Sequence, residues 1–298
     1  MDYAFSDILT LNEYTLPADC GDMQIKEYFL CGKKSAETNE DGIFLSKNFA
    51  AIVDGATAKS QFSLNGKSTG RLAMELVIKA ISKLPEGICM SDAIANISAA
   101  IYNFYKENNL LAELKNKPNL RFTASAVIYS RSLNEIWQIG GDCRFLVGST
   151  YSTNEKEIDE IMAKARAAFN ETAIINGEIT LESLKDHDPG RDFIMPFLTR
   201  QALLQNCPYE NQFSFAVFDG FTIDPKKVIV FPVGKAKEFV LSSDGYPQTF
   251  NTLEKSEQYL HAIMQKDPNC IREYKCTKGL KKGNRSFDDR AYLKIILP

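Results

Sequence analysis

Hydrophobic and polar residues alternate in several short runs of the chain, a pattern typical of strands that bury one face. In the first half the runs cover residues 25–32, 41–48, 49–55, 121–130, 133–141 and 143–150. In the second half they cover 213–220, 227–234, 237–245 and 291–298. Gly140 and Gly141, followed by Asp142, indicate a turn, so the three runs between 121 and 150 have the spacing of consecutive hairpins.

A different period, of three to four residues, predicts helices between these strands. Apolar residues recur at this spacing over 72–84, and Pro85 ends the pattern. The next helix follows Ser91, the expected N-cap, and carries an apolar stripe over 94–105. Helical spacing returns in two later segments, 155–205 and 253–265.

The order of these elements indicates the fold class. Strands come first, then two helices, further strands, a charged helical segment, more strands, a helix and a last strand. The regular alternation of strand and helix that a parallel sheet requires is missing. We therefore predict an α+β fold in which antiparallel sheets are covered by helices. Residues 1–298 are expected to form one domain, with the charged helical segment as an insertion in it.

Composition excludes some classes of partner. The 298 residues carry 35 Lys and Arg against 38 Asp and Glu, and this net charge of −3 does not call for nucleic acid or an anionic membrane. No apolar run approaches the roughly 20 residues that span a bilayer. The acidic N-terminus lacks the positive start and apolar centre of a signal peptide. We expect a cytoplasmic protein without a nucleic-acid or membrane partner.

Cysteine and histidine are poorly placed for their usual chemistry. Seven cysteines occur without a Cys-x-x-Cys pair, so neither a disulfide framework nor a zinc ribbon is indicated. The two histidines, His187 and His261, offer few candidates for a zinc site or a catalytic triad. A hard metal ion held by carboxylates needs neither residue type.

The stretch 49–70 contains two candidate sites of different kinds. Gly66-Lys67-Ser68-Thr69 matches the end of a phosphate-binding loop, but that motif needs a glycine at position 61, where this chain has Gln61. Without that glycine, these residues are interpreted as the start of a helix, with a solvated lysine. The other candidate is Asp54, which stands at the end of an apolar strand and is followed by Gly55.

Carboxylates recur near the ends of predicted strands. The positions are Glu40, Asp41, Asp54, Asp142, Asp244, Asp288 and Asp289. Strand ends can bring distant parts of a chain to one edge, and several carboxylates gathered there repel one another unless a cation compensates. A pair of Mg²⁺ or Mn²⁺ ions, which prefer oxygen ligands, would fit such a site. Each acid taken alone is better explained as part of a turn.

The residues around these acids resemble, in the same order, the motifs of the metal-dependent protein phosphatases of type 2C. The resemblance extends from about residue 25 to the end of the chain. The matching segments are Thr38-Asn39-Glu40-Asp41, Ala51-Ile52-Val53-Asp54-Gly55, Thr123-Ala124-Ser125-Ala126, Gly141-Asp142-Cys143-Arg144, Leu241-Ser242-Ser243-Asp244-Gly245 and Ser286-Phe287-Asp288-Asp289.

This resemblance implies an antiparallel β-sandwich flanked by helices, with a two-metal site at one end. It implies that Asp54 bridges the metals, that the Gly55 carbonyl is a backbone ligand, and that Glu40 or Asp41, Asp244 and Asp288 supply other contacts. Asp142, with Asp244, would hold a weaker third metal. Whether Asp288 or its neighbour Asp289 is the ligand stays open. Residues 150–210 would form the flap beside the site.

The chain also departs from the family pattern. Ala56 stands where many members have a histidine that can protonate the leaving group, and Ala36 stands where many have an arginine that binds phosphate. Lys33 and Lys34 are close enough in sequence to replace that arginine, as point charges. The basic run of Lys278, Lys281, Lys282 and Arg285 is interpreted as a solvated loop.

The predicted function is hydrolysis of phosphoserine or phosphothreonine on proteins. A water or hydroxide that bridges two Mn²⁺ or Mg²⁺ ions would attack phosphorus, with Asp54 and Asp41 as the catalytic residues. The alternative is a pseudo-phosphatase, in which the same fold serves as a binding or regulatory module. Retained acids favour the enzyme, whereas the missing histidine and arginine favour the alternative.

Overall fold

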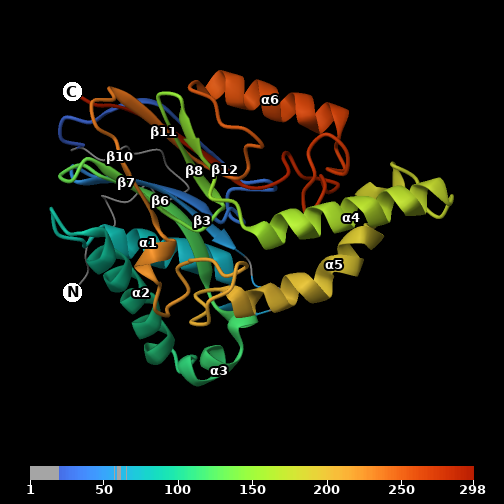
Figure 1. The fold of residues 1–298 in the computed structure, drawn as a ribbon, viewed down its shortest axis with the longest axis horizontal. Coiled ribbons are helices and arrows are strands. Elements are labelled where there is room, and N and C mark those ends of the chain that lie inside the picture. The colour runs from blue at the N-terminus through green and yellow to red at the C-terminus, as the bar shows by residue number, and fades with distance from the viewer. Residues whose placement is uncertain (1–19, 57, 59–61, 65) are drawn as a thin grey trace.

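Two antiparallel sheets stack face to face at the centre of the protein (Figure 1). The computed structural model describes residues 20–56, 58, 62–64 and 66–298, so the position of Gln61 lies outside the described residues. The first sheet has the spatial order β10 (Ile229–Pro232), β7 (Glu135–Ile139), β6 (Thr123–Ser130), β3 (Phe49–Ala56) and β2 (Asp41–Leu45). The second has the order β1 (Gln24–Cys31), β12 (Arg290–Ile296), β11 (Glu238–Ser243), β8 (Cys143–Val147) and β9 (Thr150–Ser152).

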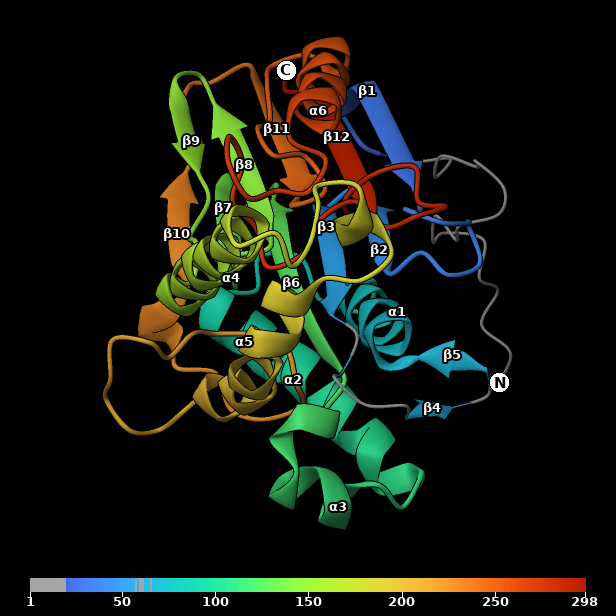
Figure 2. The ribbon, with the colours of Figure 1, turned by 90° about the vertical axis from the view of Figure 1, so that its right-hand side faces the viewer.

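Helices cover both outer faces of this sandwich. In Figure 1, α1 (Thr69–Ile81) and α2 (Met90–Glu107) lie on the first sheet, and α6 (Leu253–Lys266) lies on the second. The helices α4 (Glu157–Ile175) and α5 (Pro189–Arg200) project beyond one end of the sheets, as Figure 2 shows from that end. The predicted α+β sandwich with flanking helices is therefore confirmed.

Smaller elements complete the chain. Strands β4 (Ser63–Leu64) and β5 (Lys67–Ser68) pair before α1, and α3 (Leu111–Asn116) follows α2. The 3₁₀ helices are η2 (Pro118–Leu120), η3 (Ser183–Lys185), η4 (Gln201–Leu204) and η5 (Pro225–Lys227). None of the helices in the described ranges is both long and apolar enough to span a bilayer.

Burial on both faces explains why β3 is apolar from Phe49 to Val53. Ala51 and Val53 belong to the core between the first sheet and the helices α1 and α2. Ala50 and Ile52, which point the other way, belong to the core between the two sheets. A strand buried on both sides has no polar face, so the alternation expected for a half-buried strand disappears.

Two strand predictions are wrong. The runs 133–141 and 143–150 do not form a hairpin, because β7 and β8 belong to different sheets. Gly140, with φ of +81°, and Gly141 carry the chain from one sheet to the other. The run 213–220 forms only isolated bridges, since its backbone bonds are shared between Ala124 on β6 and the chain around residue 205.

The helix predictions agree more closely with the structure. Ser68 caps α1 by accepting a hydrogen bond from the Arg71 N–H, so the helix expected from the sequence begins at Thr69, directly after β5. The expected cap at Ser91 is wrong, because α2 begins two residues earlier than that cap implies, at Met90, and has Cys89 at its N-cap.

Candidate active site

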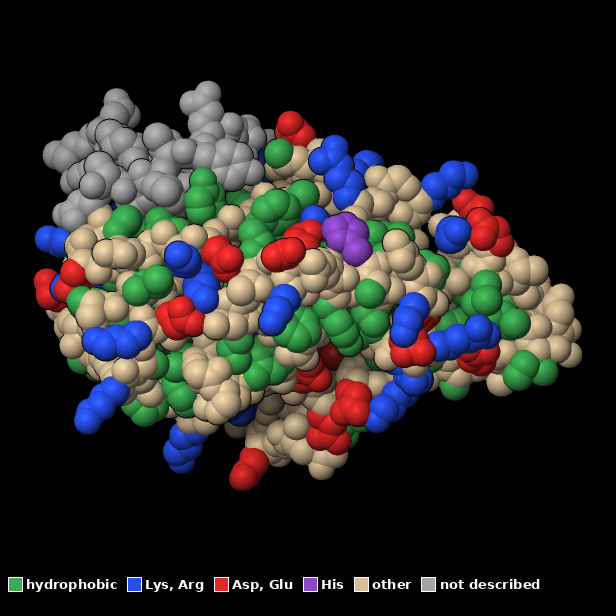
Figure 3. Space-filling model, turned by 90° about the horizontal axis from the view of Figure 1, so that it is seen from above, with side chains coloured by type: hydrophobic (Ala, Val, Ile, Leu, Met, Phe, Trp, Pro, Cys, Tyr) green, Lys and Arg blue, Asp and Glu red, His purple; other side chains and the backbone are tan. Residues whose placement is uncertain are grey.

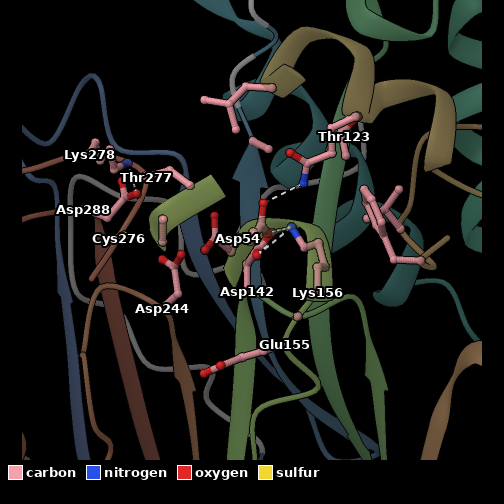
Figure 4. Close-up of a pocket in the computed structure, with 18 of the residues that line it drawn as sticks. Asp54, Thr123, Asp142, Glu155, Lys156, Asp244, Cys276, Thr277, Lys278 and Asp288 are labelled. Carbon is pink, nitrogen blue, oxygen red and sulfur yellow. Dashed lines mark hydrogen bonds and ion pairs between the residues drawn. The ribbon is translucent and has the colours of Figure 1, made fainter. Parts of the chain in front are cut away.

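A cavity of about 570 Å³ lies between strand ends of the sandwich and the helices α4 and α5. Its lining combines strand ends from both sheets, the segment 155–205 and the loop that leads into β12. Figure 4 shows acidic side chains from these distant parts of the chain around one space. The acids and lysines that line it are Lys33, Glu40, Asp54, Asp142, Glu155, Lys156, Asp159, Glu160, Lys164, Asp244, Lys275, Lys278 and Asp288.

The pairing of β2 with β3 places Asp41 directly opposite Asp54. Asp54 lies at the cavity wall, and Asp41 is buried behind it at 1% exposure. The Ser243 hydroxyl on β11 donates a hydrogen bond of 2.5 Å to Asp41 Oδ2 and accepts one of 2.8 Å from the Ala291 N–H on β12. The first sheet is thereby joined to the second at the site.

Asp244 follows β11 and approaches the same space from the second sheet (Figure 4). Its Oδ1 atom is buried and has no hydrogen-bond partner among the described residues. A buried carboxylate oxygen without a donor is unfavourable. A cation or a hydrogen-bond donor next to this oxygen would therefore stabilise Asp244.

Burial and repulsion by neighbouring acids raise the pKa of three of these carboxyls. Burial, together with the nearby charge of Asp289, raises the pKa of Asp41 well above its usual value. Burial and the charges of Asp41 and Asp244 do the same to the pKa of Asp54. Burial and the charge of Asp288 raise the pKa of Asp244 to about 7. Each shift means that the charged form lacks compensation.

Glu40 lies beside Asp41 and is held by the start of α1. Its Oε1 atom accepts a hydrogen bond from the Ser68 hydroxyl, and its backbone carbonyl accepts one of 3.1 Å from the Gly55 N–H. Glycine is needed at position 55, because a Cβ there would lie 2.0 Å from the Gly70 carbonyl oxygen. This close approach packs the end of β3 against the first turn of α1.

The two acids before β12 have different environments. Asp289 is 2% exposed and accepts hydrogen bonds from the backbone N–H groups of Lys33, at 2.7 Å, and Glu40, at 3.2 Å. Asp288 lines the cavity instead. Asp289 thus supports the loop that carries Glu40, whereas Asp288 is the acid placed to contact a ligand.

Two lysines hold Asp288. Lys33 Nζ lies 2.7 Å from Asp288 Oδ1, and Lys278 pairs with Asp288 Oδ2 (Figure 4). Burial disfavours the charged carboxylate, but the two ammonium groups outweigh it and hold the pKa of Asp288 well below its usual value. The side chains of both lysines are 26% exposed at the cavity wall.

A third lysine holds Asp142. Lys156 Nζ lies 2.8 Å from each carboxylate oxygen of Asp142, and the Ser125 hydroxyl donates to Oδ2 at 3.0 Å. Burial opposes the charged form of Asp142, yet the Lys156 ammonium outweighs it and keeps the pKa of that carboxyl below its usual value.

The residues fit a divalent cation on one side of the cavity. The unpartnered oxygen of Asp244 and the raised pKa values of Asp41 and Asp54 are what uncompensated cation ligands would show. Even so, no three His, Cys, Asp or Glu side chains in the described ranges already converge on one metal position. Ammonium groups, rather than further carboxylates, face Asp142 and Asp288.

The departures from the family pattern have structural counterparts. Ala56 is exposed at the end of β3, and no histidine is among the described residues that line the cavity. Of the two lysines expected to replace the missing arginine, Lys33 points into the cavity, whereas Lys34 is exposed and does not line it. The structure thus distinguishes Lys33 from Lys34, for which the sequence predicts the same role.

Sequence reasoning missed two lysines of the site. The interpretation of the basic run as a solvated loop is wrong for Lys278, although Lys281, Lys282 and Arg285 are exposed. The available signal for Lys278 in the sequence was its position, ten residues before the candidate ligand Asp288. For Lys156, which precedes α4 in a charged segment, the sequence contains no distinguishing pattern.

The phosphate-loop candidate does not contribute to this cavity. Lys67 Nζ lies 2.7 Å from Glu75 Oε2 on α1, and Lys67 does not line the cavity. Ser68 is used as the helix cap and as a donor to Glu40. The segment is therefore a helix start that supports the acidic site.

No protein-family model matches this chain, and no curated protein matches it in sequence. Among solved structures, it is similar to the serine/threonine phosphatase PstP/Ppp of Mycobacterium tuberculosis, with 16% identity, 92% of this chain and 98% of that chain covered, and a TM-score of 0.43. A structure of the PstP catalytic domain in complex with two manganese ions has 15% identity, covers 93% and 99%, and has a TM-score of 0.46. The serine/threonine phosphatase Stp1 of Staphylococcus aureus has 14% identity, covers 92% and 96%, and has a TM-score of 0.46.

Proposed function

We propose that this protein is a metal-dependent phosphatase that removes phosphate from phosphoserine or phosphothreonine in proteins. The observation that carries the proposal is that Asp54 and Asp244, from opposite sheets, line one cavity with Asp41 buried behind Asp54. All three carboxyls have a raised pKa, and Asp244 has an unpartnered oxygen. The order of the sequence motifs around these acids supports the same activity.

Asp54 would contact two divalent cations, Mn²⁺ or Mg²⁺, and the carboxylates around it would complete their ligand set. The acids proposed for this role are Glu40, Asp41, Asp244 and Asp288, together with the Gly55 carbonyl. When bound, such ions supply Lewis-acid chemistry: they activate a water molecule for attack on phosphorus and offset the phosphate charge. Asp289 would not contact the ions itself but would fix the backbone of Lys33 and Glu40.

Lys33 and Lys278 would bind the phosphate. Both ammonium groups contact Asp288 at the cavity wall, and both side chains are flexible enough to exchange that carboxylate for a phosphate oxygen. Asp288 would then be released toward the metal site. This exchange assigns to Lys33 the role of the arginine that is missing at Ala36.

The phosphorylated polypeptide would lie across the other end of the cavity. That part is lined by the polar side chains of Asn119, Arg121, Gln201 and Gln205 and by the ring of Phe215. Amide and aromatic groups are better suited to bind a flexible peptide than to bind a small, highly charged substrate. Segment 150–210, proposed as a flap, contributes part of this wall.

Hydrolysis of p-nitrophenyl phosphate and of a phosphothreonine peptide with Mn²⁺ tests the proposal. We expect turnover in the wild type and a loss of about 100-fold or more in Asp54→Asn and Asp244→Asn. The exposed Glu107→Gln on α2, which does not line the cavity, is the matched control and should keep full activity. Turnover that persists in Asp54→Asn would refute the assignment of the site.

A pseudo-phosphatase is the second candidate, and one observation favours it. Lysines already neutralise Asp142 and Asp288, and no histidine lines the described part of the cavity. Tight Mn²⁺ binding measured by calorimetry, without turnover of either substrate, would identify this binding module. Absence of Mn²⁺ binding would contradict both candidates.

A further inference from the structure

Lys156 occupies a cage of negative charge and aromatic surface between the sandwich and α4. It is the N-cap residue of α4, and its side chain is 11% exposed. Its Nζ atom lies 2.8 Å from both oxygens of Asp142, 3.3 Å from Asp159 Oδ2 and 5.0 Å from the centre of the Phe215 ring. Two carboxylates and an aromatic face surround one ammonium group.

In this arrangement the charge of the Asp142 carboxylate is already compensated. Lys156 engages both carboxylate oxygens, and the Ser125 hydroxyl donates to one of them at 3.0 Å. The contrast with Asp244 is direct, because Asp244 has a buried oxygen without a partner among the described residues. A divalent ion placed at Asp142 would also meet the fixed positive charge of Lys156 at close range, where repulsion is strong.

The lysines at Asp288 are more accessible from the cavity, although Lys33 Nζ also lies 3.1 Å from Asp289 Oδ2. The side chains of Lys33 and Lys278 are each 26% exposed, more than twice the 11% of Lys156, and both face the open cavity. They can turn toward an incoming phosphate. Lys156 is instead enclosed by Asp142, Asp159 and Phe215, so its charge stays at Asp142.

We propose that the Lys156 ammonium takes the place of a third divalent cation at Asp142, so that this chain binds one ion fewer than its set of carboxylates would allow. The same contact fastens the start of α4 to the acidic site. The expected total of two ions rests on the proposed function. The inference itself concerns the gain of one ion when the Lys156 charge is removed.

Counting bound Mn²⁺ tests this inference without measuring activity. The stoichiometry is determined by titration calorimetry and by the electron paramagnetic resonance signal of free Mn²⁺. We expect two ions in the wild type, three in Lys156→Met, and two again in the double variant Lys156→Met/Asp142→Asn. Lys156→Arg, which keeps the charge, should retain two.

The control is Lys164→Met on α4, whose side chain is 64% exposed and which should retain two ions. If Lys156→Met does not fold, as judged by circular dichroism, Lys156→Gln provides the same loss of charge with a polar side chain. Three ions in the wild type, or an unchanged count after removal of the Lys156 charge, would overturn the inference. A wild type with fewer than two ions that gains one on removal of Lys156 would contradict the two-metal function and support the inference.

Discussion

Individual carboxylates of the site differ in whether a cation already accompanies them. Asp142 and Asp288 are paired with lysines, which lower the pKa of each carboxyl against the effect of burial. Asp54 and Asp244 have no such partner close enough to prevent a raised pKa. The position of the unbalanced charge, rather than the number of acids, therefore indicates where a metal ion would bind.

Replacement of Asp54 by asparagine should stabilise the metal-free protein. The change removes a buried carboxylate that Asp41 and Asp244 repel, and we expect a gain of about 1–2 kcal/mol in the free energy of unfolding. Urea unfolding in the presence of a chelator measures it. With saturating Mn²⁺ the order should reverse, because the wild type alone gains the binding energy. A less stable Asp54→Asn protein without metal would contradict the repulsion argument.

Lys33 and Lys34 form a matched pair for testing phosphate binding. Lys33→Met removes an ammonium group that lines the cavity, and we expect KM for p-nitrophenyl phosphate to rise about tenfold, equivalent to about 1.4 kcal/mol. Lys34→Met removes the same charge from an exposed position and should leave KM unchanged. Steady-state kinetics of the two variants decides. Equal effects would show that overall charge, rather than a contact, governs binding.

At the scale of elements, one arginine fastens α4 to the loop that carries Lys278. Arg166 is 1% exposed, and its guanidinium donates to the carbonyls of Asn269, Cys270 and Cys276 at 2.8–3.1 Å. It also pairs with Asp188, the N-cap residue of α5, at 2.7 Å. Both helices and the loop are thus joined through one side chain, which positions the wall of the cavity opposite the sheets.

Arg166→Met should loosen this corner. The change leaves the carbonyls of Asn269 and Cys276 without a donor and Asp188 without its ion partner, so we expect a loss of about 3 kcal/mol. Hydrogen exchange measured by mass spectrometry should become faster in 267–278 and α5. Arg272→Met is the control, since Arg272 also joins this loop to α4 through Glu171, but its side chain is 52% exposed. We expect it to cost less than about 1 kcal/mol. Equal losses would contradict the argument from burial.

At the scale of the whole molecule, charge is mixed on the surface and concentrated at the site. Figure 3 shows acidic and basic side chains interspersed on the face that carries α6. Acids gather instead around the cavity, where burial weakens their screening by solvent. The stability of the metal-free protein should consequently depend on the protonation of the site.

The sign of this pH dependence follows from the raised pKa values. Asp41, Asp54 and Asp244 have a higher pKa in the folded protein than the usual value of about 4, so the folded state binds more protons than the unfolded state above that pH. Stability is lost as pH rises through the folded pKa, which is about 7 for Asp244. The lowered pKa values of Asp142 and Asp288 act only below about pH 4.

Melting temperatures of the metal-free protein should therefore fall between about pH 5 and pH 8. A loss of about 1 kcal/mol corresponds to about 2–4 °C for a chain of this size. Saturating Mn²⁺ should raise the melting temperature and reduce the slope, since the ions compensate the ionised acids. Circular dichroism melts with chelator or with Mn²⁺ measure both effects. A melting temperature that rises with pH in the presence of chelator would contradict the proposed charge imbalance.

Much of the fold was accessible from local pattern. The strands β1, β2, β3, β6, β11 and β12 and the helices α1, α2 and α6 follow the expected ranges closely, because each has a clear period or a distinct stop. The hairpin expected between β7 and β8 failed for a physical reason: a tight glycine turn can join two strands of one sheet or cross between two sheets. Local sequence does not distinguish these outcomes.

The sequence by itself determined which acids are candidates, because Asp54, Asp142 and Asp244 each stand at a strand end with a small residue beside them. Only the tertiary structure decided that Asp288 faces the cavity while Asp289 holds the backbone. It also decided that Lys33, Lys156 and Lys278 lie among the acids. The contact between Lys33 and Asp288 joins residues 255 positions apart, and such pairing depends on how the two sheets stack. Long-range packing, which leaves no mark in a local pattern, thus sets the charge balance of the site.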